Sequence, residues 1–239
     1  MENIVNNLKE IFKKSNLELS DYQAEQFIKY KDILLEYNKV MNLTAITEEE
    51  DVYVKHFLDS VLPVLTGYIE NGMNIIDVGC GAGFPSIPIK IYMPDTKFTL
   101  LDSLNKRINF LNEVIKYTDL KDVTTVHSRA EDGGRDGNLR EKFDVCVARA
   151  VAPLNILLEY CTPFVRPGGY FIALKGREAE EETENAKNAM SELKVKLCDT
   201  LNTTLHSTDN QRNILVFKKI ANTPKQYPRN AGKPKKSPL

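Results

Sequence analysis

The hydrophobic positions divide the chain into two unlike parts, and the first part has the period of an α-helix. Ser20 and Gln23 match a capping box, which marks a helix start. After it, apolar side chains alternate three and four positions apart and form one stripe on a helix: Phe27, Tyr30, Leu34, Tyr37 and Met41. We interpret this stripe as packing surface. A second helical stretch is expected from about Glu48 to Leu65.

From Met73 onward, short apolar runs alternate with helical segments. The runs have the length and composition of strands: Asn74–Val78, Lys97–Leu101, Val123–His127, Phe143–Ala148, Tyr170–Leu174, Val195–Cys198 and Asn213–Lys218. A helix is predicted over Ser103–Tyr117, where apolar residues share one face. Strands that alternate with helices form βαβ units, and a polar stretch between the last two runs can return the chain antiparallel. We therefore predict an α/β fold with a mainly parallel seven-stranded sheet and helices on both faces.

Composition and the chain start favour a protein of the cytoplasm. We expect a helical N-terminal region over residues 1–65, an α/β domain over 66–220 and a basic Pro/Lys-rich tail over 221–239. No apolar run approaches the ~18 residues of a membrane helix, and the first 15 residues lack a signal-peptide core. The four cysteines are scattered without a CxxC pair, so neither a metal site nor a disulfide framework is expected. We expect a monomer.

The formal net charge of −1 hides an asymmetry. Lys218 to Leu239 carry seven basic side chains and no acid, which leaves 25 basic side chains against 33 acidic ones elsewhere, a net charge of −8. A basic tail on an acidic body suggests a polyanionic partner; a solvated, partly disordered terminus is the alternative. The acidic run over residues 178–184 is expected to be the solvated start of a helix, where carboxylates suit the helix dipole.

A glycine-rich turn directly follows the first predicted strand. Gly79, Gly81 and Gly83 come after Asp77, near the end of that strand. Glycine permits positive φ and close approach of a ligand to the backbone, and such a turn lies at the ligand-binding edge of an open α/β sheet. The dinucleotide fingerprint G-x-G-x-x-G would need glycine at position 84, which is Phe84. The pattern D-x-G-x-G-x-G-F-P instead resembles the first motif of the S-adenosylmethionine-dependent methyltransferases.

The ends of the next two strands carry polar groups at the same predicted edge. Asp102, at the tip of the second strand, can accept hydrogen bonds from both ribose hydroxyls of a nucleotide; capping the following helix is its alternative role. In the methyltransferase fold the turn after the third strand faces the adenine, so the resemblance makes Ala130 and Glu131 candidates for this contact; a surface turn is the alternative for them. Since a dehydrogenase also places an acid after its second strand, Asp102 alone does not discriminate between the two classes.

Several separate motifs, in order along almost the whole chain, are similar to those of the RsmG (GidB) family. This family comprises bacterial methyltransferases that modify N7 of a guanine in small-subunit ribosomal RNA. The motifs are NLTAIT at 42–47, KHFLDS at 55–60, GAGFPSIPIK, LDSLNKRINFL, SRAED, ARAVAPL and the ending TPKQYPRNAGKPKKSPL. The resemblance implies a cytoplasmic enzyme with a Rossmann-like class I methyltransferase fold beside a helical N-terminal region.

The resemblance also implies site residues. Those assigned to S-adenosylmethionine, together with the rest of the glycine turn, are Asp77, Gly79, Gly81, Gly83, Phe84, Asp102, Ser103, Ala130, Glu131 and Arg149. Arg149 follows the fourth strand, and a surface ion pair is the alternative role for it. The residues expected to contact RNA, chiefly its phosphates, are Lys106, Arg107, Lys175, Lys225, Arg229, Lys233, Lys235 and Lys236. The partner would be small-subunit ribosomal RNA or the small subunit itself.

Motifs for other methyl transfers are missing from the sequence. Guanine N7 carries an in-plane lone pair and no proton, so it can attack the methyl group without a general base. The chain has no [DNS]-P-P-[YFW] run for an exocyclic amine, and Cys161-Thr162-Pro163 has the wrong order for a cytosine nucleophile. No catalytic residue is therefore assigned. A methyltransferase for a small molecule or protein, and an RNA-binding module without turnover, remain the alternatives.

Overall fold

The computed structural model describes residues 2–149, 152–205 and 210–239. It contains one seven-stranded sheet with the order β3-β2-β1-β4-β5-β7-β6. Neighbours among the first five strands pair in parallel, whereas β7 is antiparallel to both β5 and β6. The strands are β1 (Asn74–Val78), β2 (Lys97–Asp102), β3 (Val123–His127), β4 (Phe143–Arg149), β5 (Val165–Lys175), β6 (Val195–Thr204) and β7 (Gln211–Lys219). The predicted α/β fold and sheet are confirmed.

The predicted bounds of β1 to β4 are close, whereas β5 begins at Val165, five residues before its predicted start, and the predicted strands of the edge hairpin are too short. β6 continues to Thr204, six residues beyond its predicted end at Cys198. Its residues beyond Val195 are partly or fully exposed, so the strand includes many polar side chains there. An apolar run marks only a strand that is buried on both faces. The apolar pattern therefore missed the exposed part of β6, which takes up much of the polar stretch before β7.

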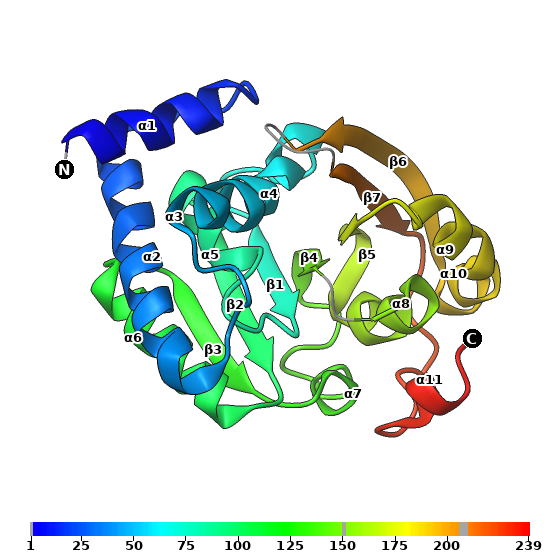
Figure 1. Ribbon diagram of the computed structural model, residues 1–239. Helices are drawn as coiled ribbons and strands as arrows, with labels where there is room; N and C mark the ends of the chain where they lie inside the picture. The colour runs from blue at the N-terminus through cyan, green and yellow to red at the C-terminus, as the bar shows by residue number, and fades with distance from the viewer. Residues whose placement is uncertain (1, 150–151, 206–209) are drawn as a thin grey trace.

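Two hydrophobic cores cover the two faces of the sheet. β1 shows why a buried strand reads as one apolar run: Ile75 lies in the first core and Ile76 in the second, because successive side chains alternate between faces. In Figure 1, α5 (Ser86–Tyr92) and α6 (Asn105–Tyr117) lie on one side of the sheet. On the other side lie α8 (Leu154–Cys161), α9 (Ala179–Asn185) and α10 (Lys187–Leu193).

The N-terminal region packs onto the first of these faces. It begins with α1 (Glu2–Lys13) and α2 (Asp21–Met41), and the capping box of Ser20 and Gln23 is present. The apolar stripe of α2 contributes to the same core as the sheet, as predicted. The stretch expected over Glu48–Leu65 is helical but changes type along its length: α3 (Glu49–Asp51), the π-helix η1 (Val52–Leu58), α4 (Asp59–Val61) and the 3₁₀ helix η2 (Leu62–Thr66).

The C-terminal segment, residues 221–239, is held against the body. The sequence indicated only a basic Pro/Lys-rich tail, whereas the segment forms turns and α11 (Lys233–Lys236), which lies near α8 in Figure 1. The cause is a buried acid on α8: the Glu159 carboxylate is fully buried and accepts hydrogen bonds from Arg229 Nε (2.9 Å) and Nη2 (2.6 Å). A buried carboxylate needs such a partner. Among the described residues, no helix is long and apolar enough to cross a membrane.

The acidic run over residues 178–184 lies at the start of α9, as expected, but one of its glutamates is paired within the protein. Most of its glutamates are exposed, but Glu182 pairs with Lys175 Nζ at 2.7 Å and accepts the Leu154 N–H at 2.6 Å. It therefore caps the start of α8 from a neighbouring element. Lys175 is buried in this ion pair and also donates to the Ala152 carbonyl, so its ammonium is already paired within the protein.

Candidate active site

The glycine turn after β1 is shaped by left-handed backbone and by contacts with two other elements. Gly79, Gly81 and Gly83 have φ of +75°, +60° and +99°. At Gly83 a Cβ would lie 2.7 Å from Ile87 Cγ1 and 2.9 Å from the Tyr30 hydroxyl, so only glycine fits. The Tyr30 hydroxyl, from α2, donates to the Ala82 carbonyl. The N-terminal region thus helps to fix the turn.

Two buried carboxylates accept backbone N–H groups in the glycine turn and directly after it. Asp77 Oδ2 accepts the Ser86 N–H at the start of α5 (3.2 Å). Asp102 Oδ2 accepts the Gly81 N–H at 2.9 Å, and its Oδ1 accepts the Leu104 N–H at 2.9 Å. The N-cap residue of α6 is Leu104, so Asp102 does not occupy the cap position itself. Asp102 instead ties the tip of β2 to the glycine turn.

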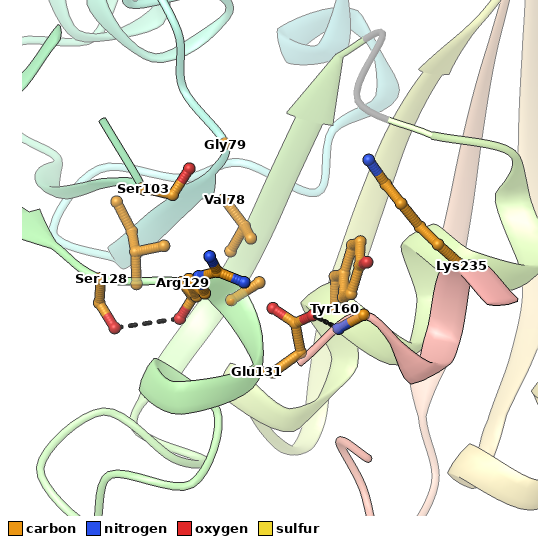
Figure 2. A pocket seen from close by; sticks show the side chains of 11 residues that line it. Val78, Gly79, Ser103, Ser128, Arg129, Glu131, Tyr160 and Lys235 are labelled. Carbon is orange, nitrogen blue, oxygen red and sulfur yellow. Dashed lines mark hydrogen bonds between the residues drawn. The ribbon is translucent and has the colours of Figure 1, made fainter. Parts of the chain in front are cut away.

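A pocket of about 250 Å³ opens at the carboxyl ends of β1, β2 and β3. Figure 2 shows Ser103 and Ser128 along one side, with Glu131 and Tyr160 along another. The residues that line the pocket are Val78, Gly79, Leu101, Ser103, Ser128, Arg129, Ala130, Glu131, Tyr160, Gly232 and Lys235. This is the edge at which open α/β sheets bind ligands, and its backbone groups and single acid suit a nucleoside.

Arg149, the last residue of β4, binds the N-terminal region rather than lying at the surface. Its Nη1 donates to Asp59 Oδ2 (3.0 Å) and Ser60 Oγ (3.1 Å), and its Nη2 lies 2.9 Å from His56 Nδ1. The guanidinium carbon also lies 5.0 Å from the centroid of the Phe84 ring, within cation–π range. Arg149 therefore joins the glycine turn to the segment that holds His56 and Asp59.

His56 is held neutral in this cluster. Because Arg149 donates to Nδ1, the proton of the neutral ring is on Nε2, which faces Thr44 Oγ1 at 2.6 Å. Burial first, and then the Arg149 charge, lower the pKa of His56 to about 4. Its ring stacks on Phe84 at 4.5 Å between centroids, with an interplanar angle of 16°. Both ring nitrogens are thus engaged, and the ring serves as a wall.

A second pocket, of about 360 Å³, opens on the other side of this cluster. Asp59 holds two arginines at its edge: besides Arg149, Arg212 Nε from β7 donates to Asp59 Oδ1 at 2.6 Å. The lining residues are Ile46, Lys55, His56, Asp59, Arg149, Leu174, Lys175, Gly176, Asn210 and Arg212. Each cation of this lining pairs with a carboxylate: Lys55 with Asp51, Lys175 with Glu182, and both arginines with Asp59. Because Asp59 serves two arginines, a small excess of positive charge remains, which suits an anionic or electron-rich ligand.

Comparison with known proteins identifies the family. A sequence model described as GidB, rRNA small subunit methyltransferase G, matches residues 23–215. The chain belongs to this family. It is 50% identical to the ribosomal RNA small subunit methyltransferase G of Alkaliphilus metalliredigens over 232 residues, 97% of each protein. It is 52% identical to that of Acetivibrio thermocellus, over 92% of this chain and 90% of the relative.

The likeness to solved structures concerns the fold. The chain resembles the crystal structure of M. jannaschii TYW2 in complex with AdoMet with a TM-score of 0.51 and 17% sequence identity. That match covers 67% of this chain and 77% of the other. The predicted Rossmann-like methyltransferase fold is thereby confirmed for this member of the methyltransferase G family.

The predicted cofactor residues of this methyltransferase G family member fall into three groups. Gly79, Ser103, Ala130 and Glu131 line the first pocket together. The acids Asp77 and Asp102 and the other glycines shape the turn behind it. Arg149 lines the second pocket, and its guanidinium lies against the Phe84 ring. As ligand contacts, all of these remain predictions.

Functional candidates that the sequence did not single out come from distant segments. Tyr30 fixes the glycine turn, Tyr160 lines the first pocket, and Arg212 reaches Asp59 from β7. His56 and Asp59 did carry a signal, because KHFLDS is one of the family-like motifs and places them three residues apart on one helix. That motif did not indicate a function for His56 and Asp59, because their partner Arg149 lies on a strand some 90 residues away in sequence.

We expect the stability of this methyltransferase G family member to report on Asp77. Burial raises the pKa of the Asp77 carboxyl from 3.8 to about 7. A raised acid pKa means that the folded state binds the proton more tightly, so stability falls as pH rises from about 4 to about 7. Asp77→Asn lacks this titration. Its stability relative to the natural chain should therefore increase with pH, by no more than about 1.4 kcal/mol per pH unit.

The measurement is urea unfolding of both proteins at several pH values from 4.5 to 8. His56 titrates in both and cancels in the difference. A difference that is constant across this range would contradict the raised pKa of Asp77.

Proposed function

We propose that this protein transfers the methyl group of S-adenosylmethionine to N7 of a guanine in small-subunit ribosomal RNA, in the cytoplasm. Membership of the methyltransferase G family supports the reaction. The observation that carries the proposal is the first pocket, where the glycine turn, the tip of β2 and Glu131 surround one cavity at the carboxyl edge of a methyltransferase sheet.

In this proposal the residues of the first pocket hold the cofactor, which supplies an electrophilic methyl group when bound. Asp102 has about four acceptor positions on its carboxylate, and three donors occupy it: Gly81 N–H, Leu104 N–H and Arg107 Nη1 at 3.3 Å. A ribose hydroxyl would take the remaining position and replace the long Arg107 contact. Glu131 and the backbone at Ala130 would bind the adenine, and the turn over Gly79–Phe84 would enclose the sulfonium end.

The second pocket is the proposed acceptor site. It lies beside Phe84 and Arg149, next to the sulfonium end of the proposed cofactor position. Its titratable candidates for a general base are already engaged: His56 Nδ1 accepts from Arg149, and both oxygens of Asp59 accept from arginines. This fits an acceptor that needs no base, as guanine N7 does. The protein would act by holding donor and acceptor in line, which is worth up to ~7–11 kcal/mol.

The decisive experiment incubates labelled S-adenosylmethionine and the protein with small ribosomal subunits, or their RNA, from cells that lack it. N7-methylguanine is then mapped by base-labile strand cleavage. Label at a guanine N7 supports the proposal. Label only in a small-molecule or protein fraction favours the alternative acceptors, and cofactor binding without any label favours an RNA-binding module.

The proposed RNA surface is carried by exposed lysines. Lys225, Lys233 and Lys236 of the C-terminal segment are exposed, as is Lys106 at the start of α6. Arg229 is engaged by Glu159, so it anchors the segment instead of facing solvent. Replacing Lys225, Lys233 and Lys236 by alanine should weaken RNA binding and lower the slope of log K against log salt by up to ~0.7–0.9 for each phosphate that is no longer neutralised.

The slope is measured by RNA binding in a series of KCl concentrations. Replacing three exposed lysines of the N-terminal region, Lys13, Lys14 and Lys29, is the charge-matched control and should leave more of the slope intact. An equal decrease of slope in both triple variants would remove the C-terminal segment from the RNA site.

A further inference from the structure

The C-terminal segment forms one wall of the first pocket. Gly232 and Lys235 line this cavity together with residues from the strand tips. Figure 2 shows Lys235 and Tyr160 on the side of the pocket away from Ser103 and Ser128. A segment whose charge suggested an RNA-binding tail therefore also contributes surface to the proposed cofactor site.

This wall has a fixed position because three arginines anchor the segment. Arg229 binds the fully buried Glu159 through both its guanidinium and its backbone N–H (2.7 Å). Arg140 donates to the carbonyls of Thr223 and Tyr227, each at 2.8 Å. Arg135 Nε donates to the Pro228 carbonyl at 3.0 Å. These bonds hold the chain on both sides of residue 228, so Gly232 begins from an anchored position.

The segment leaves two opposite charges available at the pocket. The Gly232 N–H donates to Glu131 Oε1 at 3.0 Å, which orients a carboxylate that is only 7% exposed. In the part of the chain that the structure describes, Glu131 Oε2 has no hydrogen-bond donor and the Lys235 ammonium has no hydrogen-bond or ion-pair partner. A free carboxylate oxygen and a free ammonium thus line the same cavity.

These two charged groups are of the kind that an adenine ring binds, once the exposed Lys235 side chain, which extends past Tyr160 in Figure 2, turns toward Glu131. Adenine presents an amino donor at its 6-position beside an unprotonated ring nitrogen, which is an acceptor. We propose that the C-terminal segment completes the adenine subsite: Gly232 orients Glu131 so that Oε2 accepts the 6-amino group, and Lys235 donates to the neighbouring ring nitrogen. The inference rests on the proposed function, because it takes the first pocket as the cofactor site.

The test compares two ligands, S-adenosylhomocysteine and its 6-oxo analogue S-inosylhomocysteine, by calorimetry on full-length protein. In the analogue the amino donor becomes a carbonyl and the adjacent nitrogen is protonated, so neither proposed hydrogen bond can form. Lys235→Met should weaken the binding of S-adenosylhomocysteine by at least about 10-fold, the lower end expected for one hydrogen bond to a charged group. It should change the affinity for S-inosylhomocysteine by less than about 2-fold, so the preference for adenine over the 6-oxo ring decreases.

Lys236→Met is the matched control, because Lys236 is an exposed neighbour on α11 that does not line the pocket. It should bind both ligands like the natural chain, whereas a chain that ends at Gly232 should reproduce Lys235→Met. Equal effects of the two lysine variants, or an unchanged adenine preference in Lys235→Met, would overturn the inference alone. A natural chain that binds neither ligand would overturn the proposed function and the inference with it.

Discussion

Asp102→Asn is expected to weaken S-adenosylhomocysteine binding by about 100-fold, the largest effect on cofactor affinity that the site predicts. The carboxylate is the acid at the tip of β2, and it is 2% exposed. Each hydrogen bond from a ribose hydroxyl to a charged acceptor is worth about 1.5–3 kcal/mol. Asparagine keeps the shape and one acceptor oxygen, but it removes the charge and leaves either Gly81 N–H or Leu104 N–H facing an amide donor.

Because Asp102 also holds the glycine turn through the Gly81 N–H, the experiment requires a control for the shape of the turn. Asp144→Asn supplies one, because Asp144 likewise accepts a backbone N–H, that of Asn74, and pairs with Arg166. Asp144 lies on β4 beside the first residue of β1, at the end of the sheet away from the glycine turn. Its replacement should therefore lower stability without changing ligand affinity. Arg107→Ala removes the third donor to Asp102 and should leave affinity unchanged or improve it. Calorimetry and urea unfolding of all three variants separate the roles. Unchanged affinity in Asp102→Asn would remove Asp102 from the ribose site.

The strand tips of the cofactor side could be predicted because their signals are local. β1 and β3 have the predicted bounds, and β2 is one residue longer, at Asp102 itself. A buried strand, a glycine that must adopt positive φ, and an acid at a strand end are all visible within a few residues. Parallel pairing then brings consecutive strand ends to one edge, which is why Gly79, Ser103 and Glu131 were predicted to lie together and do line one pocket.

The other half of the site could not be predicted because it depends on tertiary packing. The period of α2 shows which face is buried but not what covers it, so Tyr30 was interpreted as packing although its hydroxyl also binds the glycine turn.

The position of the C-terminal segment likewise depends on contacts between distant residues. Glu159 stands in an apolar helix and needs a cation, but nothing local indicates that the partner is Arg229, 70 positions later. Net charge counts basic residues without showing which are already paired.

The two halves of the proposed site meet at Phe84. Phe84 ends the glycine turn, and its ring stacks on the ring of His56. Arg149 lies against the same ring and binds the π-helix that carries His56. π-Helical turns occur often at functional sites, and here the turn places two backbone carbonyls, of Lys55 and His56, within 3.4 Å of Arg149 Nη1. Arg149 therefore ties the π-helix, which lines the proposed acceptor pocket, to the ring at the end of the glycine turn.

Arg149→Met is accordingly expected to lower both stability and methyl transfer. Removing one member of a buried ion pair costs about 3–5 kcal/mol, and a misplaced acceptor wall can cost about 10²-fold in rate. Arg149→Lys should recover little, because an ammonium cannot reproduce the planar fork that binds His56 and Asp59 together. Urea unfolding and single-turnover methylation of small subunits measure the two effects separately.

The titration of His56 shows whether any decrease in rate or stability arises at this cluster. Its folded pKa of about 4 lies below the ordinary 6.5, so it contributes stability at neutral pH that is lost as pH falls from 6.5 to 4. Arg149→Met removes a nearby positive charge and frees Nδ1, so the His56 pKa should rise and this pH dependence should weaken. Arg212→Met, which also releases Asp59 but does not touch His56, is the control and should leave the imidazole signals of the NMR titration closer to those of the natural chain. If the two variants show the same His56 titration and the same methylation rate, Arg149 has no special part in joining the pockets, and the acceptor site must be sought elsewhere on the sheet edge.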